Sequence, residues 1–216
     1  MGKRLIIIGA SAMGRETAHY AQECMGVNAH WDEVAGFLDT RTAIMAKYPG
    51  YPPIIATPED YQPTKGDVFV CAVGDINVRL KYVAHLQSKG AQFVSVIHPK
   101  AYIGRNVNIG IGCIICPHST IAADVIIRDH VIVNVNASIS HDCSIGEGVT
   151  LAPGCTIAGW CEIRDRVEFG THSAVLPRKI IVNDAIIGAG AVVVNNILTA
   201  GIYIGCPATV IKNERC

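Results

Sequence analysis

Charged residues are scarce in this sequence, and those present balance. The chain of 216 residues has 18 Lys or Arg and 18 Asp or Glu, so 17% of it is charged, against the usual quarter. With no basic surplus, nothing in the composition favours nucleic acid or an anionic membrane as a partner. Apolar residues reach 50% of the chain. A monomer would expose part of that apolar surface to water, so the composition favours an oligomer.

Long hydrophobic runs are absent as well. The run Leu5–Ile8 is too short for the core of a secretory signal and Arg15 follows soon after, so we expect no leader of that type. No stretch approaches the roughly 20 apolar residues of a membrane span. Nine cysteines without a secretory signal favour free thiols in a reducing compartment, and we therefore expect a cytoplasmic protein.

A strict six-residue repeat fills the second half of the chain. From Ile97 to Val193, every sixth residue is large and apolar, and the residue two places earlier is small except at Lys179. Residues i−2 and i point to the same side of a strand, so both members of each pair face inward. Three short strands joined by corners make one 18-residue coil. Stacked coils then bury the large residues in a column, which predicts a parallel β-helix.

The repeat also gives roles to the glycines and cysteines within it. Glycines directly follow an inward position, where we expect the chain to bend, at Gly104, Gly110, Gly146, Gly170 and Gly188. Cysteines fill the small inward slot at Cys113, Cys143, Cys155 and Cys161. We interpret these cysteines as packing residues, not as nucleophiles or metal ligands, and we expect no metal.

The first 96 residues have a different pattern. Apolar stretches at residues 3–9, 34–38, 68–73 and 93–97 are predicted strands, and residues 15–24 and 78–89 are predicted helices. This alternation favours a small α/β domain with a parallel sheet. The proline-rich segment Tyr48–Pro63 is a predicted loop.

Three loops at the ends of predicted strands are candidate binding loops. The loop Gly9–Gly14 leads into a helix, whose N-terminus can hold phosphate. Its spacing, however, is not that of a dinucleotide-binding fingerprint, and the Lys-Ser/Thr of a P-loop does not follow. Asp39 and Gly74–Asp75 end the second and third strands, at the edge of such sheets where ligands bind. The alternative is that all three loops only turn the chain.

One of the histidines in the repeat has distinctive neighbours. The five histidines are His98, His118, His130, His141 and His172. Most fall at corners, where exposed polar residues are expected. His141 differs because Asp142 follows it, Asn134 precedes it by seven residues, and Gly159 lies one full coil of 18 residues later. Gly159 should therefore stack above His141, leaving an open shelf with a backbone N–H beside a base.

These segments resemble the hexapeptide-repeat sugar acetyltransferases of the sialic acid and bacillosamine pathways, which acetylate oxygen or nitrogen. The likeness is carried by residues 134–146, 151–159 and 205–208, and in the first part by residues 6–11, 36–39, 74–79 and 98–99. It implies a Rossmann-like sugar-nucleotide-binding domain at residues 1–96. It also implies a left-handed parallel β-helix with a C-terminal cap at residues 97–216, assembled as a homotrimer.

The resemblance further implies a reaction and its residues. An acetyl group moves directly from acetyl-coenzyme A to a sugar amine or hydroxyl, with His141 as general base, Asp142 raising its basicity and Asn134 orienting the base or the acceptor. The implied cofactor contacts are Gly159, Gly170, Thr171, Gly188 and Ala189. The implied nucleotide-sugar contacts are Gly9, Ser11, Ala12, Met13, Asp39, Gly74 and Asp75. The family's glycine loop reads Gly-His-Gly where this chain has Ala12-Met13-Gly14, so the acceptor sugar stays unidentified.

Two alternatives stay open. A zinc enzyme on the same scaffold needs three converging histidines, two of them five residues apart, and the repeat histidines lack that spacing. A non-catalytic nucleotide-sugar-binding or scaffold protein is compatible with Met13 in the glycine loop, although the His141-Asp142 pair favours an enzyme. The sequence does not distinguish nitrogen from oxygen as the acetylated atom.

Overall fold

The computed structural model describes residues 2–211, and these fall into two compact units. The first holds the chain up to Pro99 together with Ile111–Ile114, and the second holds Lys100–Gly110 and the chain from Ile115 onward. No helix within residues 2–211 has both the length and the apolar character needed to cross a membrane.

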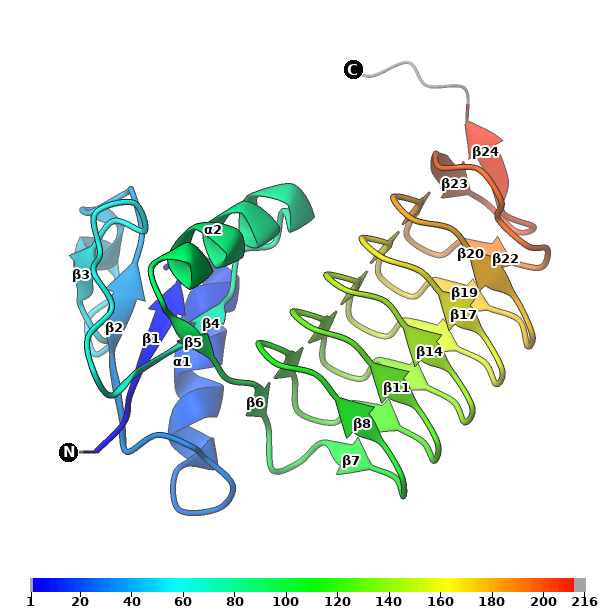
Figure 1. The fold of residues 1–216 in the computed structure, drawn as a ribbon. Coiled ribbons are helices and arrows are strands. Elements are labelled where there is room, and N and C mark those ends of the chain that lie inside the picture. Colours follow the sequence, from blue (N-terminus) through cyan, green and yellow to red (C-terminus); the bar gives the residue numbers. More distant parts are fainter. Residues whose placement is uncertain (1, 212–216) are drawn as a thin grey trace. The chain divides into compact units, whose positions relative to one another are not determined.

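The first unit is built on a five-stranded parallel sheet in the order β3-β2-β1-β4-β5 (Figure 1). Its strands are β1 (Arg4–Ile8), β2 (Glu33–Leu38), β3 (Ile54–Ala56), β4 (Asp67–Cys71) and β5 (Gln92–Phe93). Its helices are α1 (Ala12–Cys24), the short 3-10 helix η1 (Ile44–Lys47) and α2 (Ile76–Ser88). The predicted α/β domain with a parallel sheet is confirmed, and its chain order reverses between β1 and β4, where such sheets bind ligands.

The glycine loop has the sharp geometry that its residues predict. Gly9 has φ +94°, a left-handed conformation that suits glycine. A methyl group at Gly14 would overlap the carbonyl oxygen of Gly9, so only glycine lets α1 begin this close to the end of β1.

Two details of the first unit differ from the sequence-based prediction. The segment Tyr48–Pro63 is not entirely loop, because β3 lies within it and pairs with β2 at the edge of the sheet. Prolines are tolerated beside a short edge strand, since one of its sides has no ladder to complete. The predicted strand at residues 93–97 is broken: only β5 joins this sheet, while β6 (Val96–Ile97) is the end strand of a different, eight-stranded sheet.

The second unit is a parallel β-helix of two-residue strands (Figure 1). Its first sheet holds β7 (Tyr102–Ile103), β10 (Thr120–Ile121), β13 (Ser138–Ile139), β16 (Thr156–Ile157), β19 (Ala174–Val175) and β22 (Val192–Val193). The second sheet holds β8 (Asn108–Ile109), β11 (Ile126–Ile127), β14 (Ser144–Ile145), β17 (Glu162–Ile163) and β20 (Ile180–Ile181). The third begins with β6 and holds β9 (Ile114–Ile115), β12 (Ile132–Val133), β15 (Thr150–Leu151), β18 (Glu168–Phe169) and β21 (Ile186–Ile187), followed by β23 (Ile202–Ile204) and β24 (Thr209–Ile211).

The predicted phase of the repeat is confirmed by pairing and burial. Paired residues are 18 apart, as in Ile139 with Ile157, so each coil stacks directly on the next. Ile157 is completely buried, whereas its strand neighbour Thr156 is exposed. Burial raises the pKa of the Cys155 thiol to about 11, so this inward cysteine stays neutral and packs as an apolar residue. The eight cysteines within the described residues form no disulfide with one another.

The corners bend at a different position from the one predicted. Every sixth residue from Asn106 to Gly190 has a positive φ, three places after each inward residue, and most of these residues are not glycine. Glycines such as Gly146 and Gly170, directly after an inward residue, do not have a positive φ. They are needed for another reason, because a methyl group there would overlap the backbone of the next coil.

Candidate active site

The three rows of corners form three edges of the β-helix, which we name by one residue each. The His141 edge consists of the corners after β7, β10, β13, β16 and β19. The Asn134 edge consists of the corners after β9, β12, β15, β18 and β21. The Arg166 edge consists of the corners after β8, β11, β14, β17 and β20.

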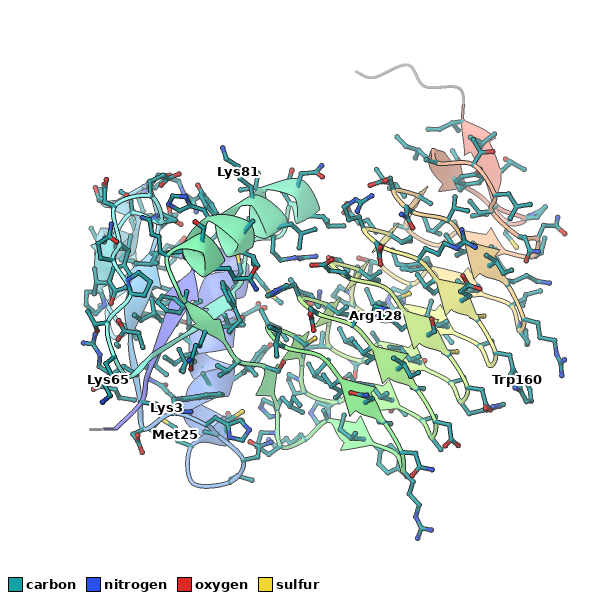
Figure 2. The ribbon with its side chains drawn as sticks, viewed as in Figure 1. Lys3, Met25, Lys65, Lys81, Arg128 and Trp160 are labelled. Carbon is teal, nitrogen blue, oxygen red and sulfur yellow. The ribbon has the colours of Figure 1, made fainter. Side chains whose placement is uncertain are left out.

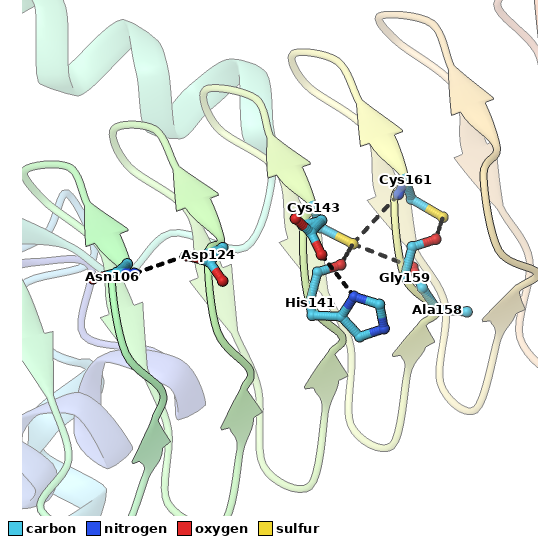
Figure 3. A network of polar contacts seen from close by, with 8 residues as sticks. Asn106, Asp124, His141, Cys143, Ala158, Gly159 and Cys161 are labelled. Carbon is cyan, nitrogen blue, oxygen red and sulfur yellow. Dashed lines mark hydrogen bonds and ion pairs between the residues drawn. The ribbon is translucent and has the colours of Figure 1, made fainter.

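His141 and Asp142 form an ion-pair-like contact at the corner after β13. The ring Nδ1 of His141 lies 2.8 Å from Oδ2 of Asp142 (Figure 3). A carboxylate only accepts hydrogen bonds, so this contact favours the tautomer with the proton on Nδ1. The other ring nitrogen, Nε2, is then left as a base. The side chains are 47% and 43% exposed, so a substrate can reach them.

Gly159 forms the shelf that the sequence predicts. A methyl group at Gly159 would lie 2.9 Å from Nε2 and Cε1 of His141, so only glycine leaves room for the ring. The Gly159 carbonyl accepts from the backbone of Arg178, and its N–H has no hydrogen-bond partner within the described chain. Behind the shelf, the thiol of Cys143 donates to the carbonyl oxygen of Ala158 at 3.2 Å (Figure 3). The contact with Cys161, together with burial, raises the pKa of this thiol, which therefore is not a nucleophile.

Trp160 is a neighbour of His141 that the sequence analysis missed. Its ring meets the imidazole edge to face, with 4.5 Å between centroids and planes at 89°. The guanidinium of Arg178 lies 4.6 Å from the centre of the same indole ring. Asp142, Trp160 and Arg178 are successive left-handed corner residues of the His141 edge. The sequence does hold one sign of Trp160, because the equivalent position of the other coils is mostly Gly, Asn, Asp or His.

The remaining predicted residues of the β-helix lie on another edge. Asn134 belongs to the Asn134 edge, and no hydrogen bond joins its side chain to His141 in the part of the chain that the structure describes. Gly170, Thr171, Gly188 and Ala189 follow β18 and β21 and so share the edge of Asn134. Within one chain, therefore, the predicted catalytic base and most of the predicted cofactor contacts are not brought together.

A pocket of about 180 Å³ lies at the carboxyl ends of β1, β2 and β4 in the first unit. It is lined by Gly9, Ser11, Leu38, Asp39, Thr40, Arg41, Pro58, Val73, Val78 and Tyr82. Three of the predicted substrate contacts, Gly9, Ser11 and Asp39, therefore meet there. Ala12, Met13, Gly74 and Asp75 are not among the lining residues. The side chain of Asp75 instead caps α2 by accepting from the Val78 N–H at 2.9 Å, as the turn-forming alternative expects.

The carboxylate of Asp39 is fully engaged within this pocket. Its Oδ1 accepts from the backbone N–H and Nε of Arg41, and its Oδ2 accepts from the Ala10 N–H and from Nη2 of Arg41, all at 2.8 to 2.9 Å. Burial by itself would raise the pKa of Asp39, but these hydrogen bonds outweigh it and lower the pKa to about 2. A nucleotide that donates a hydrogen bond to Asp39 therefore competes with these four donors.

No group of three or more His, Cys, Asp or Glu residues among residues 2–211 is placed to hold a metal ion.

Comparison with protein families gives two matches that cover different parts of the chain. Residues 4–86 match the family described as PglD N-terminal domain. Residues 124–159 match the bacterial transferase hexapeptide family with six repeats, a span that contains His141 and ends at Gly159.

Solved structures match over nearly the full chain. The acetyltransferase domain of PglB from Neisseria gonorrhoeae is 26% identical, with a TM-score of 0.86 over 97% of this chain and 100% of that one. PerB from Caulobacter crescentus, solved with CoA and GDP-perosamine, is 26% identical, with a TM-score of 0.85 over 96% of this chain and 97% of that one. WeeI from Acinetobacter baumannii is 26% identical, with a TM-score of 0.85 over 97% and 100% of the two chains.

These matches confirm the expected fold, an α/β domain followed by a left-handed parallel β-helix of hexapeptide repeats. The chain therefore combines a match to the PglD N-terminal domain with a match to the bacterial transferase hexapeptide repeats, and it is an acyltransferase similar to the sugar acetyltransferases named above.

Proposed function

We propose that this protein transfers the acetyl group of acetyl-coenzyme A to the amine of a nucleotide-linked amino sugar. The observation that carries the proposal is the His141 corner, where Asp142 holds Nδ1 and Nε2 lies over Gly159. The similar PglB domain was solved with acetyl coenzyme A, and the similar PerB with CoA and GDP-perosamine. A similar enzyme from Caulobacter crescentus is described as a perosamine N-acetyltransferase, which favours nitrogen as the acetylated atom.

The proposed reaction is a direct transfer without a covalent enzyme intermediate. The amine nitrogen attacks the thioester carbonyl carbon while Nε2 of His141 removes the proton that the nitrogen loses. The resulting oxyanion accepts a hydrogen bond from the Gly159 N–H, which needs no rearrangement to donate it. Collapse re-forms the carbonyl and breaks the carbon–sulfur bond. The leaving thiolate takes the proton back from His141, which restores the base.

We propose that the working site forms between copies of the chain in a homotrimer. His141 and the predicted cofactor contacts lie on different edges of the β-helix, so a ligand touching both needs the Asn134 edge of a second copy. Exposed apolar side chains such as Ile126, at 50% exposure, and Leu176, at 43%, are consistent with surfaces that an assembly covers. Asn134 would then act on the base or the acceptor of a neighbouring copy.

We propose that the nucleotide part of the acceptor binds in the pocket of the first unit. Arg41 is the cationic residue among those lining it, and its side chain is 57% exposed, so its guanidinium is available to a diphosphate. Buried cysteines without disulfides favour a reducing compartment, and we place the reaction in the cytoplasm.

The test is a thiol-release assay with acetyl-coenzyme A and a panel of nucleotide-linked amino sugars. We expect turnover with at least one acceptor and a mass gain of one acetyl group on its nitrogen. His141→Ala should lower kcat by about 10² or more, because general-base help is worth 10² to 10⁴ in rate. Asp142→Asn should cost less, because it tunes the base without replacing it. Calorimetry should still detect CoA binding to His141→Ala, since the H141A mutant of the Caulobacter enzyme was solved with CoA.

A matched control separates loss of the base from loss of the fold. Ala123 occupies the same corner position one coil earlier, so alanine fits the backbone at position 141. His85→Ala removes a partly exposed histidine from the last turn of α2 and should leave turnover unchanged. Near-normal kcat in His141→Ala would assign the base to another residue. Binding of nucleotide sugars without any turnover in the wild type would favour the non-catalytic alternative.

A further inference from the structure

Trp160 is a bulky residue in a backbone conformation that bulky residues avoid. Its φ is 57°, in the left-handed region, where a side chain beyond Cβ is strained unless the surroundings hold it. Glycine, Asn and Asp adopt this conformation at lower cost, and they occupy most of the corresponding corners, including Asp124 and Asp142 on the same edge. A tryptophan at this corner therefore needs a reason that lies in its side chain.

The packing of the fold does not supply that reason. Trp160 is 50% exposed, and it belongs to a corner outside the column of inward residues (Figure 2). The backbone role of the corner is independent of the side chain, because the Trp160 N–H donates to the His141 carbonyl oxygen, as any residue except proline would. What the indole ring does contact is the imidazole of His141 on one side and the guanidinium of Arg178 on the other.

The imidazole needs such a contact to keep one orientation. Its bond to Asp142 joins two neighbouring, half-exposed side chains, and pairs of that kind hold geometry weakly in water. Gly159 leaves open space beside the imidazole ring, so it does not by itself hold the ring in one orientation. The edge-to-face contact with Trp160, with 4.5 Å between ring centroids, adds a second support from the next coil.

We infer that Trp160 is a positioning residue for His141, held in turn by Arg178. The indole keeps the imidazole turned so that Nδ1 faces Asp142 and Nε2 stays over Gly159, where the acceptor amine is to be deprotonated. Arg178 stacks on the indole and limits its rotation. The inference rests on the proposed role of His141 as the base, but the orientation of the ring can be measured without any acceptor.

The experiment compares Trp160→Gly, Trp160→Phe and a control variant. Glycine suits the left-handed backbone, so Trp160→Gly should fold at least as stably as the wild type by melting temperature. Its kcat should nevertheless fall roughly 10- to 100-fold, as expected when a catalytic group loses its position, while the KM for acetyl-coenzyme A changes less than about twofold. Trp160→Phe keeps an aromatic ring and should recover most of the loss. Arg166→Gly introduces glycine at a corner of the same φ, 56°, on another edge and should leave kcat unchanged.

A second readout follows the ring itself. Nitrogen NMR of His141 should find mainly the Nδ1–H tautomer in the wild type and in Trp160→Phe, and a mixture of both tautomers in Trp160→Gly. If Trp160→Gly keeps both the tautomer and kcat within about twofold of the wild type, the inference is wrong. A loss of kcat with an unchanged tautomer also overturns it. Failure of the wild type to acetylate any acceptor counts against the proposed function, whereas the tautomer comparison still decides the role of Trp160.

Discussion

At the scale of single residues, the clamp between Asp39 and Arg41 shows how hydrogen bonds overrule burial. The Asp39 side chain is 5% exposed, yet its pKa is lowered to about 2, because four donors stabilise the carboxylate. The clamp ties the loop after β2 to the Ala10 N–H of the glycine loop, so it fixes two walls of the pocket together.

This clamp predicts a stability that depends on pH. The pKa of Asp39 is lower in the folded chain than in the unfolded chain, so its contribution to the free energy of unfolding is present above pH 4. That contribution is lost as the pH falls from about 4 through about 2. Asp39→Asn should therefore be less stable than the wild type to urea at pH 7, and the difference should shrink steadily between pH 4 and pH 3. A difference that is constant over this range would contradict the lowered pKa.

Residues differ in how far the sequence reveals them. His141, Asp142 and Gly159 are predictable, because the repeat fixes their phase and a spacing of 18 residues stacks them. Trp160 is not, because the same repeat makes each corner residue look like a simple turn. The contact of Arg41 with Asp39 is not predictable either, because it depends on the conformation of a short loop that has no repeat.

At the scale of elements, the two-residue strand determines which side chains point into the β-helix and which point to its surface. The second residue of each strand faces the column, and the pairing across coils keeps this phase from Ile103 to Val193. The first residue is exposed in most strands, as Thr156 is, although Ile114 and Ile132 are buried at this position too. The phase was predictable because an uninterrupted period leaves no freedom of register. The strand β3 and the break before β6 were not predictable, because tertiary pairing decides such short segments and local preference does not.

The phase gives a sharp comparison between two neighbouring substitutions. Ile157→Asp places a carboxylate in the column with no partner, where desolvation costs several kcal/mol of the free energy of unfolding. Thr156→Asp places the same carboxylate on the exposed face of β16, where water solvates it. Thermal unfolding should find a large drop in melting temperature for Ile157→Asp and a small change for Thr156→Asp. Similar melting temperatures would mean that the inward assignment of Ile157 is wrong.

At the scale of the whole molecule, the separation of His141 from the Asn134 edge makes assembly part of the proposed chemistry. Each active site of the proposed trimer takes the base from one copy and Asn134 from another. The six-residue repeat alone predicts neither the number of copies nor their contacts. It determines which residues of a coil point inward, whereas assembly depends on the outer faces of the β-helix.

This arrangement predicts that two inactive variants restore each other. His141→Ala and Asn134→Ala should each have little activity alone. Mixed trimers formed by co-expression should recover part of it, because one interface then joins an intact His141 to an intact Asn134. Light scattering of the wild type should give three times the chain mass. A stable monomer at micromolar concentration, or mixed assemblies as inactive as the separate variants, would rule out a site shared in this way.

The constant step of 18 residues between stacked positions also bears on how such a chain can change length. Duplicating or deleting one whole coil in the gene would move the later coils by one step of about 4.8 Å along the axis, while every inward residue kept its place in the column. An insertion that is not a multiple of six would turn later inward residues outward unless a corner absorbed it. The distance from the catalytic corner to the C-terminal strands can therefore change only in discrete steps of one coil.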